Sequence, residues 1–438
     1  MRTSEYDRTL HYLFGLRTFG IHLGLEISRS LAEKVGNPQN QYPAVHIAGT
    51  NGKGSTCSLI ESVLREKGLK TGLYTSPHLI DFNERIKVNG VPISDEAIIE
   101  YAETLKESVE KSGASFFEVT TVIALKYFAD MEVDIAVVET GLGARLDTTM
   151  LVNPVITIIS SISIDHAKYL GDTIKKIAKE KSFVMRKGVK CVVSKNSEEV
   201  LEVIKQHAEE SDVEILMASG VCTVSKVIFR DDGLTFDAEI ENIPMKDISV
   251  PLMGEHQIEN IQSALAALRN MPGLSLAEEE IRNGFNNVSV RGRMEIVSKD
   301  PLAIYDVAHN PNAVKNLFKA LNKHYPTKRI VTLLALLSEK DHKKIIKELS
   351  GKCTKLICSE IPGHDSVSAS NLSDEGNKCA IDSVKILEFD DALQSALNAV
   401  DKDSLLIIFG SHYFAENIYT KFSSFLQKRD RPEIKALT

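Results

Sequence analysis

The chain has 438 residues, a length that predicts two or three domains and not a single core. Its composition, 43% hydrophobic and 26% charged, is that of an ordinary soluble globular protein, and its formal net charge of −8 excludes a general nucleic-acid binder. The six cysteines form no C-x-x-C pair, so we expect reduced thiols in a cytoplasmic protein. We expect no signal peptide, and no apolar run approaches the roughly 18 residues of a membrane span.

Strand and helix patterns alternate up to about residue 210, which predicts a mostly parallel α/β sheet. A buried strand at 42–48 leads into a glycine-rich loop. A helix then runs from about Ser55 to Lys67, with Gly68 as its stop signal. Further elements of this sheet are expected as strands at 70–75, 133–139 and 154–160 and a helix at 118–130.

The residue pattern changes between 212 and 252, where two β-rich runs flank an Asp-Asp-Gly turn. This pattern predicts a hairpin in a small antiparallel annex. A helix at 258–268 closes the first domain, and we place the boundary near residue 290. The second domain, 291–438, is expected to be a smaller Rossmann-like α/β fold, with strands at 302–308, 329–336, 354–360 and 404–410. In it, Asn310 should cap a helix whose first residue is Pro311.

The stretch "AGTNGKGST", residues 48–56, indicates phosphate binding more strongly than a plain strand-to-helix turn. Its three glycines let the backbone approach an anion closely, and the N-terminus of the following helix adds its dipole. Lys53 can reach the outer phosphates. The loop departs from the usual P-loop pattern because Gly54 follows Lys53. Its G-x-x-G-x-G spacing also excludes a dinucleotide fingerprint.

Polar residues follow two other buried strands of the first domain. Glu139 ends one strand, at the position where nucleotide-binding sheets hold Mg²⁺. Asp165 and His166 follow the next, and for His166 a ligand role and a packing role stay equally open.

Lys181 lies on the apolar stripe of a helix, in register with Ile174, Ile177 and Ala178. A lysine on a buried stripe is costly unless it is paired or modified, and the alternative is a side chain that extends its amine to water.

The second domain shows the same arrangement at its strand ends. Individually these residues fit turn or cap chemistry, and together they mark the edge where open α/β sheets bind ligands. They are Arg291 and Arg293 near the domain junction, Asp306 and His309 after one strand, and Ser411 and His412 after another.

Several of these stretches together resemble the folylpolyglutamate synthase/dihydrofolate synthase family of the Mur ligase superfamily. The resemblance begins at "YLFGLRTFGIHLGLE" and covers most of the chain. It is carried by "HIAGTNGKGST", "YTSPHLIDFNERI", "VVETGLGARLDTT", "IDHAKYLGDT", "IAKEKS", "GEHQIENIQSALAAL", "RGRMEI" and "YDVAHNPNA". The sequence departs from the family at Ala167 and Met150, where family members often carry Thr and Asn.

The resemblance implies roles for particular residues. Lys181 looks like the family's carbamylated lysine and, with Lys53 and His309, would be catalytic. ATP would contact Gly52, Lys53, Gly54, Ser55, Asn260, Arg293 and Asp306. Mg²⁺ would be held by Ser76, Glu139 and His166, and glutamate by His309 and Ser411.

The implied reaction joins L-glutamate to a folate-type carboxylate through an acyl phosphate, with ATP and Mg²⁺ as cofactors. The expected partners are small molecules only, without nucleic acid or membrane, and the chain is expected to be a monomer. Closure of the two domains would align the reactants and exclude water. Whether dihydropteroate, reduced folates or both are substrates stays open. The alternatives are another Mur-type ligase acting on a cell-wall precursor and a non-catalytic nucleotide-binding regulatory protein.

Overall fold

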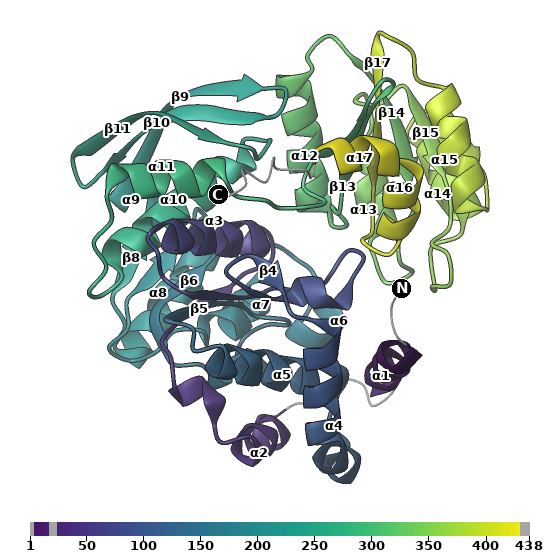
Figure 1. Ribbon diagram of the computed structural model, residues 1–438. Coiled ribbons are helices and arrows are strands. Elements are labelled where there is room, and N and C mark those ends of the chain that lie inside the picture. The colour runs from purple at the N-terminus through teal and green to yellow at the C-terminus, as the bar shows by residue number, and fades with distance from the viewer. Residues whose placement is uncertain (1–3, 17–23, 430–438) are drawn as a thin grey trace, which may run out of the picture. The chain divides into compact units, whose positions relative to one another are not determined.

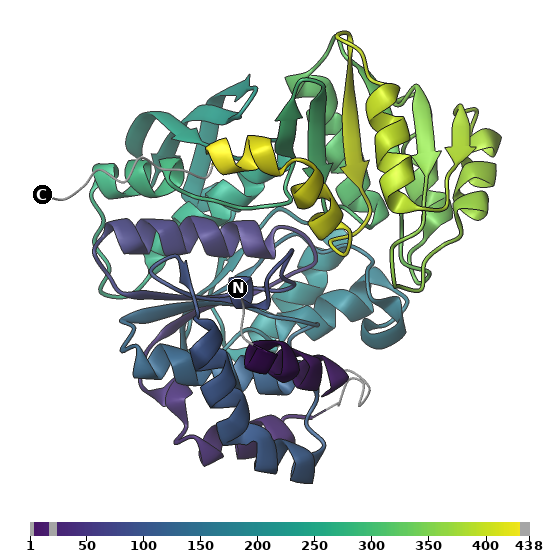
Figure 2. The same ribbon diagram turned by 45° about the vertical axis from the view of Figure 1, so that its right-hand side comes forward.

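The structure, a computed structural model, describes residues 4–16 and 24–429 (Figures 1 and 2). It contains two compact units: unit 1 joins residues 1–227, 235–251 and 257–289, and unit 2 joins 228–234, 252–256 and 290–438. Residues 17–23, which carry part of the N-terminal resemblance, lie outside the described residues. Among the described residues, no helix is long and apolar enough to cross a membrane.

An eight-stranded sheet, in the order β4-β3-β2-β5-β1-β6-β7-β8, forms the centre of unit 1. The six strands from β2 to β8 in this order run parallel, and β3 and β4 extend one edge in the antiparallel sense. The parallel strands β1, β5 and β7 are buried throughout, as expected for a sheet covered on both faces. The strand bounds are β1 Ala44–Ala48, β2 Thr71–Tyr74, β3 Ile86–Val88, β4 Val91–Pro92, β5 Ile135–Glu139, β6 Pro154–Ile159, β7 Cys191–Val193 and β8 Ile215–Met217.

Helices cover both faces of this sheet (Figure 1). One face carries α1 (Ser4–Gly15), α2 (Glu26–Lys34), α4 (Asp95–Ser112) and α5 (Phe116–Asp130), and the other carries α3 (Lys53–Glu66), α10 (His256–Asn270) and α11 (Glu278–Asn286). The remaining helices are α6 Ala167–Leu170, α7 Ile174–Ser182, α8 Glu198–Ser211 and α9 Ala218–Val221. Three 3-10 turns are η2 Pro38–Asn40, η3 Phe82–Arg85 and η4 Thr148–Leu151. The expected strand–helix alternation of the first half is therefore confirmed.

A small three-stranded sheet follows, in the order β11-β10-β9. Its strands are β9 Cys222–Arg230, β10 Gly233–Ile240 and β11 Ile243–Val250. The turn at 231–232 joins β9 to β10, so the predicted hairpin is confirmed, and β11 adds a third strand to it.

Unit 2 is built on a six-stranded sheet in the order β12-β13-β17-β14-β15-β16, in which only β12 runs antiparallel to its neighbour. The four strands expected from the sequence are confirmed, and β12 and β16 are additional. Its strands are β12 Glu295–Lys299, β13 Leu302–Asp306, β14 Arg329–Leu334, β15 Lys355–Cys358, β16 Ser383–Lys385 and β17 Ser404–Phe409. Its helices are α12 Pro311–His324, α13 His342–Lys347, α14 Ala369–Lys378, α15 Phe389–Asn398, α16 Ala415–Lys421 and α17 Ser423–Arg429.

Two of the helix signals in the sequence act as expected. The Asn310 side chain accepts a hydrogen bond of 2.9 Å from the Ala313 amide, which caps α12, and Pro311 is the first helical residue. Gly68 follows α3 with a left-handed φ of 87° and ends that helix. The N-terminus of α3 is at Lys53, two residues before the expected start, so the loop lysine belongs to the first helical turn.

Within unit 2, His324 at the end of α12 holds two short segments of chain. Its Nε2 accepts from the Gly254 amide at 3.0 Å, which leaves Nδ1 to donate to the Arg230 carbonyl at 2.7 Å. The Tyr325 hydroxyl donates to the Asp231 carbonyl at 3.2 Å. Burial lowers the pKa of His324, which favours this neutral form. These hydrogen bonds make segments 228–234 and 252–256 part of unit 2.

In unit 1, α11 approaches α3 closely at Gly284. The Ser62 hydroxyl donates to the Gly284 carbonyl at 2.7 Å, and a Cβ built on Gly284 would lie 2.6 Å from Val63 Cα. Glycine is therefore required at position 284 because a larger side chain does not fit, and not because of the backbone conformation.

We predict that Gly284→Ala destabilises the protein by about 1–2 kcal/mol. Alanine gains about 1 kcal/mol of helix propensity. The clash costs about 2–3 kcal/mol, the upper part of the range for overpacking, because a backbone atom yields less than a flexible side chain. Urea unfolding measures the change. Gly220→Ala is the matched control, since its Cβ would meet nothing closer than 3.9 Å. Equal effects of the two substitutions would contradict the steric argument.

Candidate active site

The carboxyl ends of the central strands of unit 1 bring four stretches of polar chain to one edge. Ile47 pairs with Glu139, Ala48 with Ile159 and Tyr74 with Val138, so β1, β5, β6 and β2 end at the same level. This edge is where open α/β sheets bind their ligands.

The loop after β1 is shaped by two close approaches. A Cβ on Gly49 would lie 1.8 Å from Ser160 Oγ, and a Cβ on Gly52 would lie 2.2 Å from Asn260 Oδ1. Gly52 also has a left-handed φ of 88°. Neither position tolerates a side chain, and the contact at Gly52 puts Asn260, a predicted ATP residue, against the loop.

Hydrogen bonds join this loop to the segment that follows β6. The Thr50 and Asn51 amides both donate to the Ser161 carbonyl, at 2.9 and 3.1 Å. The Thr50 hydroxyl donates to the Ser163 carbonyl at 3.1 Å and accepts from the Ser163 amide, also at 3.1 Å. The loop is thereby fixed to the chain that leads directly to Asp165 and His166.

Three residues singled out in the sequence meet at this edge. Lys53 Nζ lies 3.6 Å from Glu139 Oε1 and donates to the Thr50 carbonyl at 3.3 Å. The other oxygen of Glu139 accepts from the Ser76 amide at 3.2 Å. Glu139 is only 5% exposed, and a carboxylate so buried requires such partners.

Hard oxygen donors such as the Glu139 carboxylate and the Ser76 hydroxyl suit Mg²⁺. A Cβ built on Gly54 would lie 3.5 Å from Glu139 Oε2, so the loop backbone passes directly beside the carboxylate. His166 adopts a left-handed φ of 51° at the start of α6. The described part of the chain holds no group of three His, Cys, Asp or Glu able to bind a metal ion. These residues thus fit an ion that takes its remaining ligands from phosphate and water, as Mg²⁺ commonly does.

Lys181 lies on the apolar stripe of α7, and only 5% of it is exposed. Its amine donates to the Gly49 carbonyl at 2.6 Å, so it does not extend into water. Burial lowers the pKa of Lys181 to about 7, helped by the charge of Lys53 and opposed by Asp165, Asp147 and Glu139. A substantial fraction of the amine is therefore neutral and nucleophilic near pH 7.

A buried polar network beneath this edge was not predicted. Asp147 accepts from the Leu142 amide at 2.7 Å and from the Thr149 amide at 3.0 Å. The Thr149 hydroxyl lies 2.8 Å from Nε2 of His46, whose pKa burial lowers to about 3. This network fixes the "GLGARLDTT" segment, which the sequence marked only through the family resemblance.

Two buried threonine hydroxyls in unit 1 were also not predicted from the sequence. Thr56 Oγ1 in α3 and Thr140 Oγ1 after Glu139 are buried, and neither finds a hydrogen-bond partner within the described residues. Such groups are rare in folded proteins. Their only sequence signal is adjacency to Ser55 and Glu139.

In unit 2 the predicted residues also lie at one edge, because Asp306 pairs with Phe409 and Phe409 with Leu334. His309 Nδ1 lies 2.8 Å from the Val307 carbonyl. Ser411 is 3% exposed, and its hydroxyl accepts from the Tyr413 amide at 3.1 Å.

Asp306 has a structural task in this unit. Its two oxygens accept from the Met294 amide at 2.8 Å and the Ala308 amide at 2.7 Å. Burial raises the pKa of Asp306, whereas Arg293 and these hydrogen bonds lower it. Asp306 therefore shapes the turn that carries Arg293.

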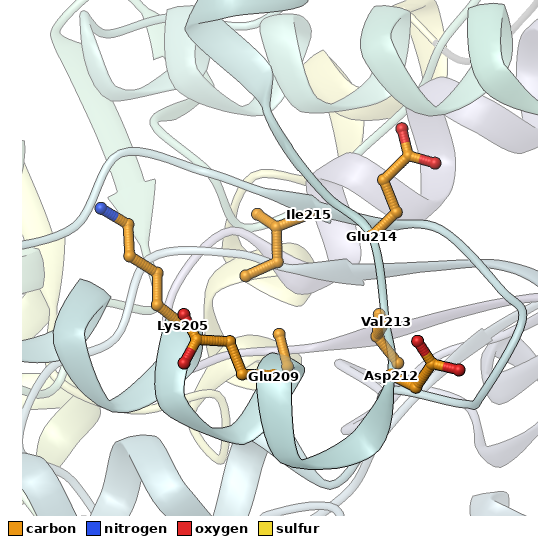
Figure 3. A pocket seen from close by; sticks show the side chains of 7 residues that line it. Lys205, Glu209, Asp212, Val213, Glu214 and Ile215 are labelled. Carbon is orange, nitrogen blue, oxygen red and sulfur yellow. The ribbon is translucent and has the colours of Figure 1, made fainter.

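A depression of about 400 Å³ lies between the end of α8 and the start of β8, and none of the predicted site residues lines it (Figure 3). Its charged residues are Lys205, Glu209, Asp212 and Glu214. Two of its carboxylates pair with lysines outside the lining, Asp212 with Lys187 and Glu214 with Lys190, each at 3.5 Å.

Comparison with known proteins identifies the family. The Mur ligase middle domain matches residues 47–268, and the Mur ligase glutamate ligase domain matches residues 292–412. The dihydrofolate synthase/folylpolyglutamate synthase of Bacillus subtilis is 32% identical over 95% of this chain and 98% of its own. The chain belongs to the dihydrofolate synthase/folylpolyglutamate synthase family of Mur ligases.

Solved structures of this family have the same fold. A Mycobacterium tuberculosis folylpolyglutamate synthase complexed with ADP and AMPPCP aligns with a TM-score of 0.88 at 28% identity, over 96% of this chain and 98% of that one. Escherichia coli FolC in complex with DHPP and ADP aligns with a TM-score of 0.86 at 26% identity, over 95% and 98%. The family and fold expected from the sequence are confirmed.

The lowered pKa of Lys181 predicts that this family member forms a carbamate near neutral pH. CO₂ reacts only with a neutral amine, and a lysine with the ordinary pKa is neutral in fewer than about one molecule in a thousand at pH 7. At a fixed pressure of ¹³C-labelled CO₂, a carbamate signal in the ¹³C NMR spectrum should grow steeply between about pH 6 and pH 8.

Lys181→Arg is the control, because its guanidinium stays protonated over this range. A signal of equal size in Lys181→Arg would assign the carbamate to another amine. No signal in the unsubstituted protein would show that Lys181 is not carbamylated.

Proposed function

We propose that the protein is an ATP-dependent ligase that adds L-glutamate to the carboxylate of a folate-type substrate and releases ADP and phosphate. The observation that carries the proposal is the meeting of Lys53, Ser76 and Glu139 beside a glycine loop, in a chain matched along almost its whole length by folylpolyglutamate and dihydrofolate synthases. The substrate class comes from these relatives, and the phosphate chemistry comes from the geometry of unit 1.

In this proposal residues 1–290 bind the nucleotide. The loop residues Gly52, Lys53, Gly54 and Ser55 hold the phosphates, and Asn260 supports the loop from α10. Ser76, Glu139 and His166 would hold Mg²⁺, which when bound neutralises charge on the transferring phosphoryl group. Lys53 lies beside the Glu139 carboxylate and adds a second positive charge there.

The chemistry proceeds in two steps. An oxygen of the substrate carboxylate attacks the γ-phosphorus of ATP, which forms an acyl phosphate and releases ADP. The glutamate amine then attacks the acyl carbon, an amide bond forms and inorganic phosphate leaves. A free carboxylate is a poor electrophile, and activation supplies its leaving group. Carbamylated Lys181 would replace a buried cation by an anion beside the loop, a charge suited to supporting the metal ion.

Residues 291–438 take the second substrate in this proposal. Glutamate carries two carboxylates, so its site needs donors, and His309 and Ser411 stand at the carboxyl edge of the sheet of unit 2. Arg293 and Asp306 are assigned to the nucleotide. For Asp306 this role is indirect, because both of its carboxylate oxygens already accept hydrogen bonds from backbone amides.

We further propose a monomeric cytoplasmic enzyme whose partners are small molecules, without nucleic acid or membrane. The net charge of −8 supports this, as do the six cysteines, all of which are free thiols. The folate-type substrate is dihydropteroate, a reduced folate or both.

The test measures glutamate-dependent ADP release with dihydropteroate, with tetrahydrofolate and with a nucleotide-linked cell-wall precursor. Turnover with a pteroate or folate, together with a product heavier by one glutamate residue, is the expected result. Lys53→Ala should lower turnover by about 100-fold or more, because it removes a charge aimed at the reacting phosphate. The control Lys67→Ala, an exposed residue just after the same helix, should change it less than about twofold.

Turnover with the cell-wall precursor alone would favour the other Mur-type activity. ATP binding without glutamate-dependent ADP release would favour a regulatory protein. Full activity in folded Lys53→Ala would refute the phosphate role of the loop.

His309→Ala should raise the KM for glutamate by about tenfold or more and leave the KM for ATP nearly unchanged, because a lost hydrogen bond to a charged group costs about 1.5–3 kcal/mol. Steady-state kinetics with each substrate varied in turn measure both constants. His342→Ala, at the first residue of α13, is the matched control. Weakened ATP use alone, or no change in either constant, would remove His309 from the glutamate site.

A further inference from the structure

The turn at residues 291–295 of unit 2 has an unusual backbone. Gly292 and Met294 both adopt left-handed conformations, with φ of 66° and 48°, on either side of Arg293. A methionine rarely adopts this conformation, and such residues persist only where their surroundings enforce them. Gly292 and Met294 are buried, whereas Arg293 between them is partly exposed.

Two buried carboxylates enforce this backbone. Glu295 Oε2 accepts from the Gly292 amide at 2.8 Å, and Asp306 Oδ2 accepts from the Met294 amide at 2.8 Å. The Gly292 carbonyl in turn accepts from the Val307 amide at 3.0 Å. Glu295 of β12 therefore holds the backbone before Arg293, and Asp306 of the paired strand β13 holds the backbone after it.

Glu295 is itself fixed by a residue more than a hundred positions away. The Tyr419 hydroxyl in α16 donates to Glu295 Oε2, the oxygen that also takes the Gly292 amide. Glu295 is 9% exposed, so this donor and the Arg291 guanidinium, whose Nε lies 4.0 Å from Oε1, offset the cost of a buried carboxylate.

The ring of Tyr419 makes a second contact with the same turn. The Arg291 guanidinium carbon lies 4.0 Å from the ring centroid, a cation–π geometry. On its other side the ring packs edge-on against Tyr305, with centroids 6.1 Å apart. Tyr305 precedes Asp306 in β13, so the aromatic contacts and the carboxylates form one support for the turn.

We propose that Tyr419 and Glu295 are positioning residues that hold Arg293 in the conformation in which it contacts the nucleotide. The inference rests on the proposed function through the role of Arg293. It assigns a positioning role to two residues that are not among the predicted binding residues, and it accounts for a left-handed methionine beside the arginine.

The experiment compares Tyr419→Phe with Tyr325→Phe, a hydroxyl deletion from another buried tyrosine of unit 2 that donates to a carbonyl away from the turn. Tyr419→Phe keeps the ring and its contact with Arg291. It should raise the KM for ATP and the Kd for ADP by about five- to tenfold and leave the KM for glutamate unchanged. Tyr325→Phe should change each of the three constants by less than about twofold. It should lower the thermal stability about as much as Tyr419→Phe does.

A double-mutant cycle separates positioning from general damage. If Tyr419 acts through Arg293, adding Tyr419→Phe to Arg293→Ala should change the Kd for ADP by less than about twofold beyond Arg293→Ala alone. Glu295→Gln, which removes the charge and keeps the size, should follow the same pattern, and it replaces Tyr419→Phe if that variant does not fold.

Unchanged nucleotide constants in Tyr419→Phe, or an effect that persists in the Arg293→Ala background, would overturn the positioning role. That result is distinct from a failure of the proposed function. The ligase activity of the unsubstituted protein tests the function, and the Kd for ADP tests the positioning without any turnover.

Discussion

One hydrogen bond, from the buried Lys181 amine to the Gly49 carbonyl, joins the two most demanding parts of unit 1. On one side is a loop in which Gly49 and Gly52 leave no room for a side chain. On the other is a helix that places an ionisable group in its apolar stripe. The carbonyl partly compensates the buried amine, and the amine holds the loop at the point where β1 ends. The depressed pKa of Lys181 follows from this burial, and so does any reactivity of the amine toward CO₂.

In each unit, buried or half-buried polar side chains hold loops in place at strand ends. At strand ends, backbone amides donate hydrogen bonds to the Thr50 hydroxyl and to the carboxylates of Asp147 and Asp306. Loops at the edge of a parallel sheet have few backbone partners of their own, and side chains supply the missing acceptors. The two units use the same solution, with carboxylates and hydroxyls replacing the hydrogen bonds that a continuing strand would make.

Local patterns were sufficient to predict the glycine loop after β1, the Asn310 cap and the parallel strands β1, β2, β5, β6, β13, β14, β15 and β17. Each of these depends on residues within one turn of helix or one strand. The strands β12 and β16 were not predicted because neither shows an apolar run. β12 begins with a buried glutamate, and β16 consists of two half-buried residues and one exposed residue. The link between Tyr419 and Glu295 spans 124 positions, and the Ser28–Thr148 contact spans 120. No periodicity reports such pairs, because they exist only once the sheets have formed.

The contacts of His324 bear on how this chain can be divided. A cut at residue 290 separates the two matched family domains neatly in sequence, yet the fragment from 291 onward would lack both Gly254 and Arg230. The imidazole would lose a donor and an acceptor, and the Tyr325 hydroxyl would lose its acceptor, the Asp231 carbonyl. Unit 2 is therefore completed by segments that precede residue 290 in the chain. A fragment that begins at residue 291 keeps every strand of the six-stranded sheet and still lacks two pieces of its own unit.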